Sequence, residues 1–484
     1  MAKFYGVRTE EAKSSVATPD KANTGICIAF GTAPVHQVGG SANEVIAVNS
    51  YEEAVSAVGY SDNWDKYTLC EVIYSHFKLY GMAPLLLVNV MDPAENQADE
   101  AEKSYTISGG KVVLDEDAIA DTIVVKGESS TTYKAGTDYD VVYSDGACII
   151  EVLAGGAIDS AKVSSVKVSY KKVSFELSAM KEKIIGGYDV STGVSTGLEL
   201  MDLAFFKTGV LPDILIAPGF SQDAEIAAVM ASKTEFSSVF KGSCFCDMET
   251  STANVYNKAI TAKQGEESFR RPRQVICWPK VKKGDKIYHL STQLAGLQCS
   301  IDMASESVPS RAASNHVLQA DSAVLADGTE VLMDITQANA LRENGFVTAV
   351  SMLGEIRAWG AHNACVPDND DPKDMMIHTS RMLSYINNYA ILTFWDKVDE
   401  HITARYAEAI VDELGSWLDN LTANGHLYGA RCELKKEENS LDALAKGIIK
   451  IHIYLAVPRL ASEVDFVIEY DSSYIESALS EILA

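Results

Sequence analysis

The clearest pattern of apolar and polar positions lies in the last quarter of the chain, between Asp396 and Tyr470. Apolar residues recur there at steps of three and four, the spacing of a helix with one buried face. We expect Asp396 to cap the start of this helix and Gly425 to end it. The apolar positions are Val398, Ile402, Ala409, Ile410, Leu414, Trp417, Leu418 and Leu421.

After Gly447 the apolar period changes from helical to two residues, which predicts a strand that Pro458 ends. A second alternating run, up to Tyr470, is expected to fold back on the first. Two strands alone leave at least one sheet edge open, and an open edge is either guarded or pairs with another chain. We therefore predict strand exchange between subunits at the inward-facing positions of both runs. These are Ile449, Ile451, Ile453, Leu455, Val464, Phe466 and Ile468.

Upstream, continuous apolar runs alternate with helical patterns, as in an α/β sheet that is covered on both faces. This alternation of strand and helix patterns covers residues 25–98 and continues over residues 177–361. The interruption between them predicts one discontinuous α/β domain. Between them, residues 99–176 carry six short alternating strands separated by glycine-rich turns. We expect an inserted all-β domain, a small sandwich or barrel.

The remaining segments complete a multidomain fold. Residues 362–470 read as an α+β C-terminal module, reached through an aspartate- and proline-rich linker. Residues 1–24 and 471–484 show no core of their own and are expected to be terminal arms that gain structure on a neighbour. A length of 484 residues agrees with about three domains at ~150 residues each.

The composition narrows the choice of partners. The chain has 41 Lys and Arg against 67 Asp and Glu, a net charge of −26, which argues against nucleic acid or an anionic membrane as a partner. No segment has the pattern of a signal peptide or the roughly 18 apolar residues of a spanning helix. The nine cysteines are scattered and odd in number, so we expect reduced core thiols. We expect no metal and no cofactor.

Catalytic motifs are nearly absent. Gly193-Val-Ser-Thr-Gly197 fits the pattern of a hydrolase nucleophile elbow around Ser195, but no apolar strand precedes it. We expect a glycine-rich loop there and a protein that is not an enzyme. A serine hydrolase that uses Ser195 is the enzymatic alternative, and a glycan- or receptor-binding module that uses the β domain is the other.

A basic stretch interrupts the acidic chain, with eight Lys or Arg and three Asp or Glu between Lys263 and Lys286. Two interpretations stay open, a solvated face or a contact with the acidic surface of another copy. The candidate residues for inter-subunit charge contacts are Arg270, Arg271, Arg273, Lys282 and Lys283.

Several segments together resemble one protein family. Ile335 to Gly345, Phe346 to Val350 and the stretch Gly354 to Ala361 with Trp359 are similar to motifs of the contractile tail sheath proteins of bacteriophages and phage-tail-like bacteriocins. In the last module the similar stretches are Arg381 to Ile386, Gly425 to Ala430 and Ile449 to Phe466. His362-Asn363 stands where the family has arginine-threonine, which puts local contacts in doubt.

The resemblance implies more than the residues do, since the residues alone indicate only a self-associating multidomain protein. It implies a subtilisin-like α/β domain without a catalytic triad, in a subunit that stacks as rings around an inner tube. Contraction would drive the tube through a bacterial envelope for genome ejection. The implied partners are further copies of the chain, the tail tube, baseplate and tail terminator proteins. The implied place is a virion tail or tail-like particle, assembled in the cytoplasm of the host bacterium.

Overall fold

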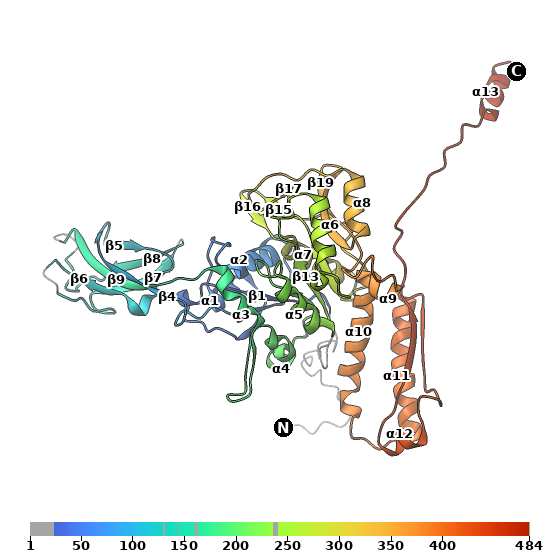
Figure 1. The fold of residues 1–484 in the computed structure, drawn as a ribbon, viewed down its shortest axis with the longest axis horizontal. Coiled ribbons are helices and arrows are strands. Elements are labelled where there is room, and N and C mark those ends of the chain that lie inside the picture. Colours follow the sequence, from blue (N-terminus) through green and yellow to red (C-terminus); the bar gives the residue numbers. More distant parts are fainter. Residues whose placement is uncertain (1–23, 129–130, 145, 160–162, 236–240, 484) are drawn as a thin grey trace, which may run out of the picture. The chain divides into compact units, whose positions relative to one another are not determined.

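The computed structural model describes residues 24–128, 131–144, 146–159, 163–235 and 241–483. It divides into two compact units, of which the first ends at His401 and the second begins at Ile402 (Figure 1). The arm expected at residues 1–24 lies outside the described residues except for Thr24, which is buried and donates its hydroxyl hydrogen to the backbone oxygen of Ser307 at 2.7 Å.

An eight-stranded sheet organises the first unit, in the order β19-β18-β14-β13-β12-β1-β3-β2. Neighbouring strands are parallel from β18 to β3, and the two edge strands, β19 and β2, run antiparallel to their neighbours. The mixed α/β multidomain class predicted from the sequence is thereby confirmed. The strands are β1 (Cys27–Gly31), β2 (Val45–Val48), β3 (Leu85–Asn89), β12 (Ile214–Ile216), β13 (Ser243–Asp247), β14 (Gln274–Cys277), β18 (Phe346–Met352) and β19 (Glu355–Trp359).

Helices cover both faces of this sheet, because successive side chains of each buried strand point to opposite cores. In β1, for example, Cys27 and Ala29 enter one core while Ile28 and Phe30 enter the other. The first core also receives α1 (Tyr51–Val58), α2 (Thr68–Ile73), the π-helix η2 (Tyr74–Leu79), α7 (Leu290–Ala304) and the start of α10 (Ile377–Phe394). The second receives α3 (Lys181–Ile185), α4 (Ala204–Thr208), α5 (Ala224–Glu235), α6 (Tyr256–Gly265) and α8 (Ile335–Glu343).

The inserted segment forms two three-stranded antiparallel sheets around a small core of its own. A strand occurs at each of the six predicted places, but the first is much longer than predicted and begins at Gln97, before the expected start of the insertion at residue 99. One sheet has the order β4 (Gln97–Thr106), β9 (Ser165–Val173) and β6 (Val124–Lys126), and the other β5 (Lys111–Leu114), β8 (Ala147–Val152) and β7 (Tyr139–Ser144). Asp117 ties the insertion to the α/β body through an ion pair with Lys66, 2.5 Å between Nζ and Oδ2, and a hydrogen bond from the Tyr67 hydroxyl.

The cysteines lie in the interior, as the scattered spacing predicts. All nine cysteines are unpaired thiols, and only Cys432 is not fully buried. Over the part of the chain that the structure describes, no helix combines the length and the apolar character needed to cross a membrane.

Residues 362–401 fall in the first unit and not with the C-terminal module, because α10 is buried against the α/β body from Ile377 to Asn388. This differs from the sequence expectation of a boundary at residue 362. The other predicted domain limits stay predictions.

The second unit contains α11 (Ala404–Ala423), β20 (Gly429–Glu433), α12 (Leu441–Ala445), β21 (His452–Ala456) and α13 (Ser473–Leu483). The prediction that Asp396 caps the long helix is wrong, since Asp396 lies in the 3-10 turn η7 (Trp395–Lys397). The helix begins at Ala404 because the Thr403 hydroxyl accepts a hydrogen bond from the backbone N–H of Tyr406.

The predicted hairpin partner is also wrong. β21 pairs with β20 in antiparallel register, Cys432 opposite Ile453, and residues 461–470 form no strand. The predicted partner follows β21 in the chain and does not pair with it, whereas β20 follows α11 and packs on it.

Candidate assembly surfaces

The two-stranded sheet of the second unit offers two open edges. Among the described residues, no further strand pairs with the outer edge of β20 or of β21. One face of the sheet lies on α11, where Ile410, Leu414 and Leu418 are buried and the Cys432 thiol lies 3.1 Å from the backbone oxygen of Val411. Ile453, the partner of Cys432, shares this face because cross-strand pairs point the same way.

The opposite face of this sheet is polar and held in place by stacked side chains. The rings of His452 and Tyr454 lie 4.4 Å apart, and the Arg431 guanidinium sits 3.9 Å from the centre of the Tyr454 ring. His452 Nδ1 lies 2.9 Å from a carboxylate oxygen of Glu438. The alternation predicted between apolar Ile453 and Leu455 and polar His452 is therefore observed, on a shorter strand than expected.

Two of the predicted exchange residues, Ile449 and Ile451, lie before the strand and not in it. The reason is Asn439, whose side chain accepts from the backbone N–H of Lys450 and donates to its oxygen, each at 2.8 Å. A side-chain amide thus occupies the groups that a partner strand would use. Strand pairing begins only at His452.

The segment after β21 is extended and exposed, and it alternates in character. The side chains of Val464, Phe466, Ile468 and Tyr470 are between 67% and 93% exposed. Single exposed apolar residues are ordinary, but an alternating run of them has the pattern of a strand, and here neither face of it is covered. The helix α13 that follows also exposes Tyr474 and Ile482. The structure does not test whether these residues exchange between subunits.

The basic stretch does not form one patch. Arg273 donates to the Ser384 hydroxyl at 2.9 Å, and burial lowers the pKa of its guanidinium. Arg270 pairs with Asp368 at 2.8 Å and Arg271 with Glu267 at 3.5 Å.

The lysines of the stretch are similarly divided. Lys263 is buried, donates to the backbone oxygen of Val366 at 2.9 Å, and has its pKa lowered to about 8 by that burial. Lys283 donates to Gln319 at 3.1 Å. Lys282 is half-buried, and its ammonium group makes no hydrogen bond or ion pair among the described residues. Of the five candidates, Arg271 and Lys282 are therefore the most available to another copy.

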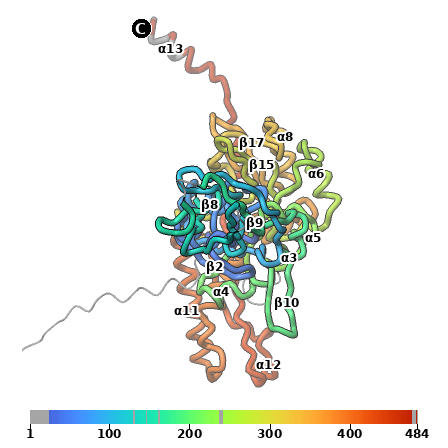
Figure 2. The backbone as a smooth tube through the Cα atoms, turned by 90° about the vertical axis from the view of Figure 1, so that its left-hand side faces the viewer, coloured from blue at the N-terminus to red at the C-terminus, as the bar shows by residue number. Residues whose placement is uncertain are grey.

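Ser195 lies on a hairpin that stands away from the α/β body (Figure 2). The hairpin consists of β10 (Gly187–Asp189) and β11 (Val194–Thr196), and Ser195 is opposite Tyr188. The expectation of a loop is wrong in this detail, because these strands pair with each other. A nucleophile elbow stands at the carboxyl end of a central strand, and Ser195 does not.

A buried ion cluster, which the sequence does not reveal, fixes α10 to the sheet. Arg381 is 2% exposed, and its Nη2 lies 2.5 Å from Asp213 and 2.6 Å from Asp302. Burial raises the pKa of the Asp302 carboxyl to about 6, although Arg381 opposes that shift. Gln298 donates a further hydrogen bond to Asp302 at 2.8 Å.

Comparison with known proteins shows which proteins share the sequence and the fold of this chain. No protein-family model matches the chain. A tail sheath protein of Burkholderia phage BcepMu is 22% identical over 98% of both chains. Two solved structures share the fold: the sheath complex of the extracellular contractile injection system PVC in its contracted state and the contracted helical sheath of the anti-feeding prophage AFP.

The structural agreement extends over the whole chain. The PVC sheath gives a TM-score of 0.57 at 14% identity, covering 98% of this chain and 99% of its own. The AFP sheath gives 0.55 at 12% identity, covering 97% and 100%. These findings confirm the resemblance found in the sequence motifs. The chain has the fold of contractile sheath proteins.

Proposed function

We propose that this chain is the structural subunit of a contractile tail sheath, which polymerises around an inner tail tube and contracts to drive the tube through a host envelope. The observation that carries the proposal is likeness to sheath proteins along almost the entire length, in sequence and in fold. The unpaired strand-like segment of the second unit supports it independently, since such a segment suits an assembling subunit.

The proposed link between subunits is the addition of a strand. Residues 464–470, when extended at ~3.3 Å per residue, span roughly 23 Å, enough to lie along a five-residue strand. A neighbour's segment would then saturate the open edge of β20 or β21 with backbone hydrogen bonds. Such a tether can bend when the lattice shortens, because its hydrogen bonds lie within one small sheet and not between rigid faces.

Finer features of the proposal follow from the family resemblance. The α/β domain is subtilisin-like without a triad, and the protein is not an enzyme. Besides further copies, its partners are the tail tube, baseplate and tail terminator proteins. It works in a virion tail or tail-like particle, is assembled in the host cytoplasm, and uses residues 1–24 as a second arm. Arg271 and Lys282 contribute charge contacts between copies.

Two single substitutions of matched exposure test the strand addition. Phe466 and Val467 are both largely exposed but have opposite parity along the segment, so only Phe466 shares a face with Val464 and Ile468. Phe466→Asp should abolish sheath-like tubes in negative-stain micrographs while the melting temperature of the subunit stays unchanged. Val467→Asp should still assemble. Tubes of wild-type abundance from Phe466→Asp would contradict the proposal.

A further inference from the structure

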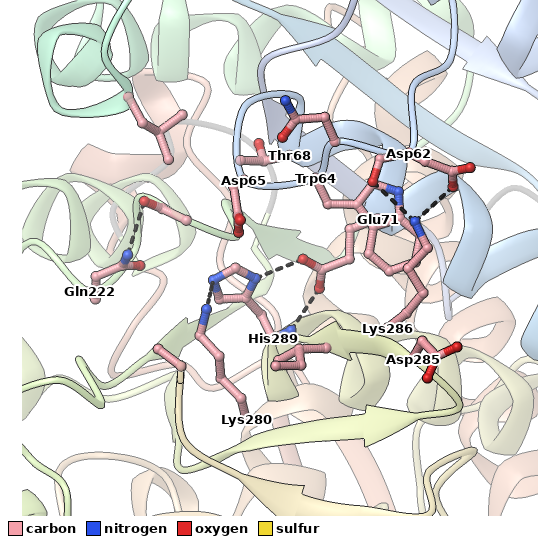
Figure 3. Close-up of a pocket in the computed structure, with 15 residues that line it drawn as sticks. Asp62, Trp64, Asp65, Thr68, Glu71, Gln222, Lys280, Asp285, Lys286 and His289 are labelled. Atoms are coloured by element: carbon pink, nitrogen blue, oxygen red, sulfur yellow. Dashed lines mark hydrogen bonds and ion pairs between the residues drawn. The ribbon is translucent and has the colours of Figure 1, made fainter. Parts of the chain in front are cut away.

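A cavity of about 340 Å³ opens in the first unit at the carboxyl edge of the central sheet (Figure 3). Gly219 and Gln222, which line it, follow β12, and Lys280 follows β14. The strands β3 and β2, which follow β1 in the chain, lie on one side of it, and β12, β13 and β14 lie on the other. The strand order therefore reverses between β1 and β12, beside the cavity. Open α/β sheets bind ligands in the crevice at such a reversal.

The inner wall is a hydrogen-bonded chain that ends on an ammonium group. Glu71, 1% exposed, accepts from the backbone N–H of His289 and lies 2.7 Å from its Nδ1. A hydrogen on Nδ1 leaves Nε2 as an acceptor, and the Lys280 Nζ lies 3.0 Å from it.

Lys280 therefore presents its charge to the cavity. It makes no ion pair with any carboxylate of the described residues. An ammonium has three hydrogens, of which His289 takes one, so two remain for a ligand. Placed inside a cavity, an ammonium that lacks a carboxylate selects for an anionic acceptor.

The other side of the cavity offers hydrogen-bond acceptors and not a cation. The amide nitrogen of Gln222 donates to the backbone oxygen of Gly219 at 3.0 Å, which orients its Oε1 as an acceptor. That buried oxygen has no hydrogen-bond donor within the described chain. Asp65 lines the same cavity (Figure 3) and forms no ion pair among the described residues. This side favours a ligand with N–H donors and positive charge.

The outer lining consists of one lysine that is already paired and of several carboxylates. Lys286 forms an ion pair with Asp62 at 2.8 Å, and its Nζ lies 4.6 Å from the centre of the Trp64 ring. Its charge is therefore already neutralised by a residue of the cavity wall. Asp65 and Asp285 add two more carboxylates to the lining. A purely anionic ligand would meet these carboxylates, and a purely cationic one would meet Lys280.

We propose that this cavity binds a small zwitterion of the amino-acid class. Its carboxylate lies on the Lys280 ammonium, and its own ammonium lies against Gln222 Oε1 and the Asp65 carboxylate. Such a ligand would give both the Lys280 ammonium and the Gln222 amide oxygen a partner. The cavity volume is at the small end of the range for ligand pockets, which suits a small molecule. The site is separate from the proposed assembly segment and does not depend on the sheath function.

Binding can be tested on the full chain with the common L-amino acids, each supplied singly, and with acetate and methylammonium as half-ligands. We expect one or more amino acids to raise the melting temperature of wild-type protein, with neither half-ligand doing so at equal concentration. Calorimetric titration then gives the affinity. Lys280→Met should weaken it about tenfold or more, the loss of one charge-assisted contact.

Two further variants keep the result interpretable. Lys282 is on the same strand as Lys280, β15 (Lys280–Lys283), but does not line the cavity. The Lys282→Met variant should therefore bind the amino acid as tightly as the wild type does. Gln222→Leu keeps Lys280 and removes the acceptor, so it should also lose affinity even if Lys280→Met folds poorly. The proposal is overturned if no amino acid binds wild type, if acetate alone binds equally well, or if both cavity variants keep full affinity.

Discussion

Replacing Arg381 by methionine removes the cation from a fully enclosed ion cluster. Its Nη1 and Nη2 reach both oxygens of Asp302 at 3.0 and 2.6 Å, and Nη2 also reaches Asp213. The methionine side chain fills much of the same volume. The variant therefore leaves two carboxylates buried, at 6% and 0% exposure, without a positive charge.

The magnitude follows from the burial of both partners. Breaking a buried ion pair by removing one member costs about 3–5 kcal/mol in the free energy of unfolding. We expect the upper part of that range at neutral pH, because two carboxylates lose the same partner. Protonation of a carboxylate relieves the cost, so the loss must depend on pH.

The sign of that dependence can be worked out from Asp302. Its folded-state pKa is raised to about 6, so between about pH 4 and pH 6 the folded protein holds more protons than the unfolded chain. Stability from this group falls as pH rises through that window. Without Arg381 the pKa of Asp302 rises further and the fall extends to higher pH. The cost of Arg381→Met should thus be larger at about pH 8 than at about pH 5.

Urea unfolding of the unassembled chain, followed by tryptophan fluorescence at both pH values, measures this difference. Arg311→Met is the matched control, because Arg311 is exposed, and it should change the free energy of unfolding by at most about 0.5 kcal/mol. The reasoning is refuted if Arg381→Met costs no more than the control at about pH 8, or if its cost is the same at both pH values.

Three further predictions concern the two units. Leu418→Ala, at a fully buried position of α11, should lower the free energy of unfolding of the second unit by about 2–5 kcal/mol in urea titration, and a loss below 1 kcal/mol would place Leu418 outside its core. Replacing residues 98–172 by an Asn-Gly turn should leave a soluble, cooperatively unfolding protein, since Gln97 and Val173 are already paired, and insolubility would contradict that. Ser195→Ala should change neither stability nor labelling by a fluorophosphonate, and a labelled wild type would show a reactive serine.

The elements that the sequence predicts well are those whose signal is local. A strand buried on both faces, such as β3 with Leu85 to Val88, must be apolar throughout, so it stands out as a continuous run. The strands of the insertion stand out by alternation and by glycine turns. In both cases the residues that decide the structure are the residues of the element itself.

The predictions that fail depend on contacts between distant segments. Arg381 meets Asp213 and Asp302, which lie 168 and 79 residues away in the sequence, and no local pattern joins them. The cavity similarly combines Glu71 with His289, 218 residues apart. The start of α11 was misplaced because Asp396 and Thr403 are both good capping residues, and only the folded turn shows which one is used.

The failed hairpin has a different origin, and it bears on assembly. Residues 464–470 alternate as a strand does, yet they stay unpaired in the single chain, while β20, with its weak pattern, pairs with β21. Local pattern reports that a segment suits a sheet, but not that the sheet is in the same molecule. Exposing Val464, Phe466 and Ile468 together stabilises nothing in a monomer. Under the proposed function this alternation is explained by the open edge of a neighbour, where the same side chains become the covered face of an added strand.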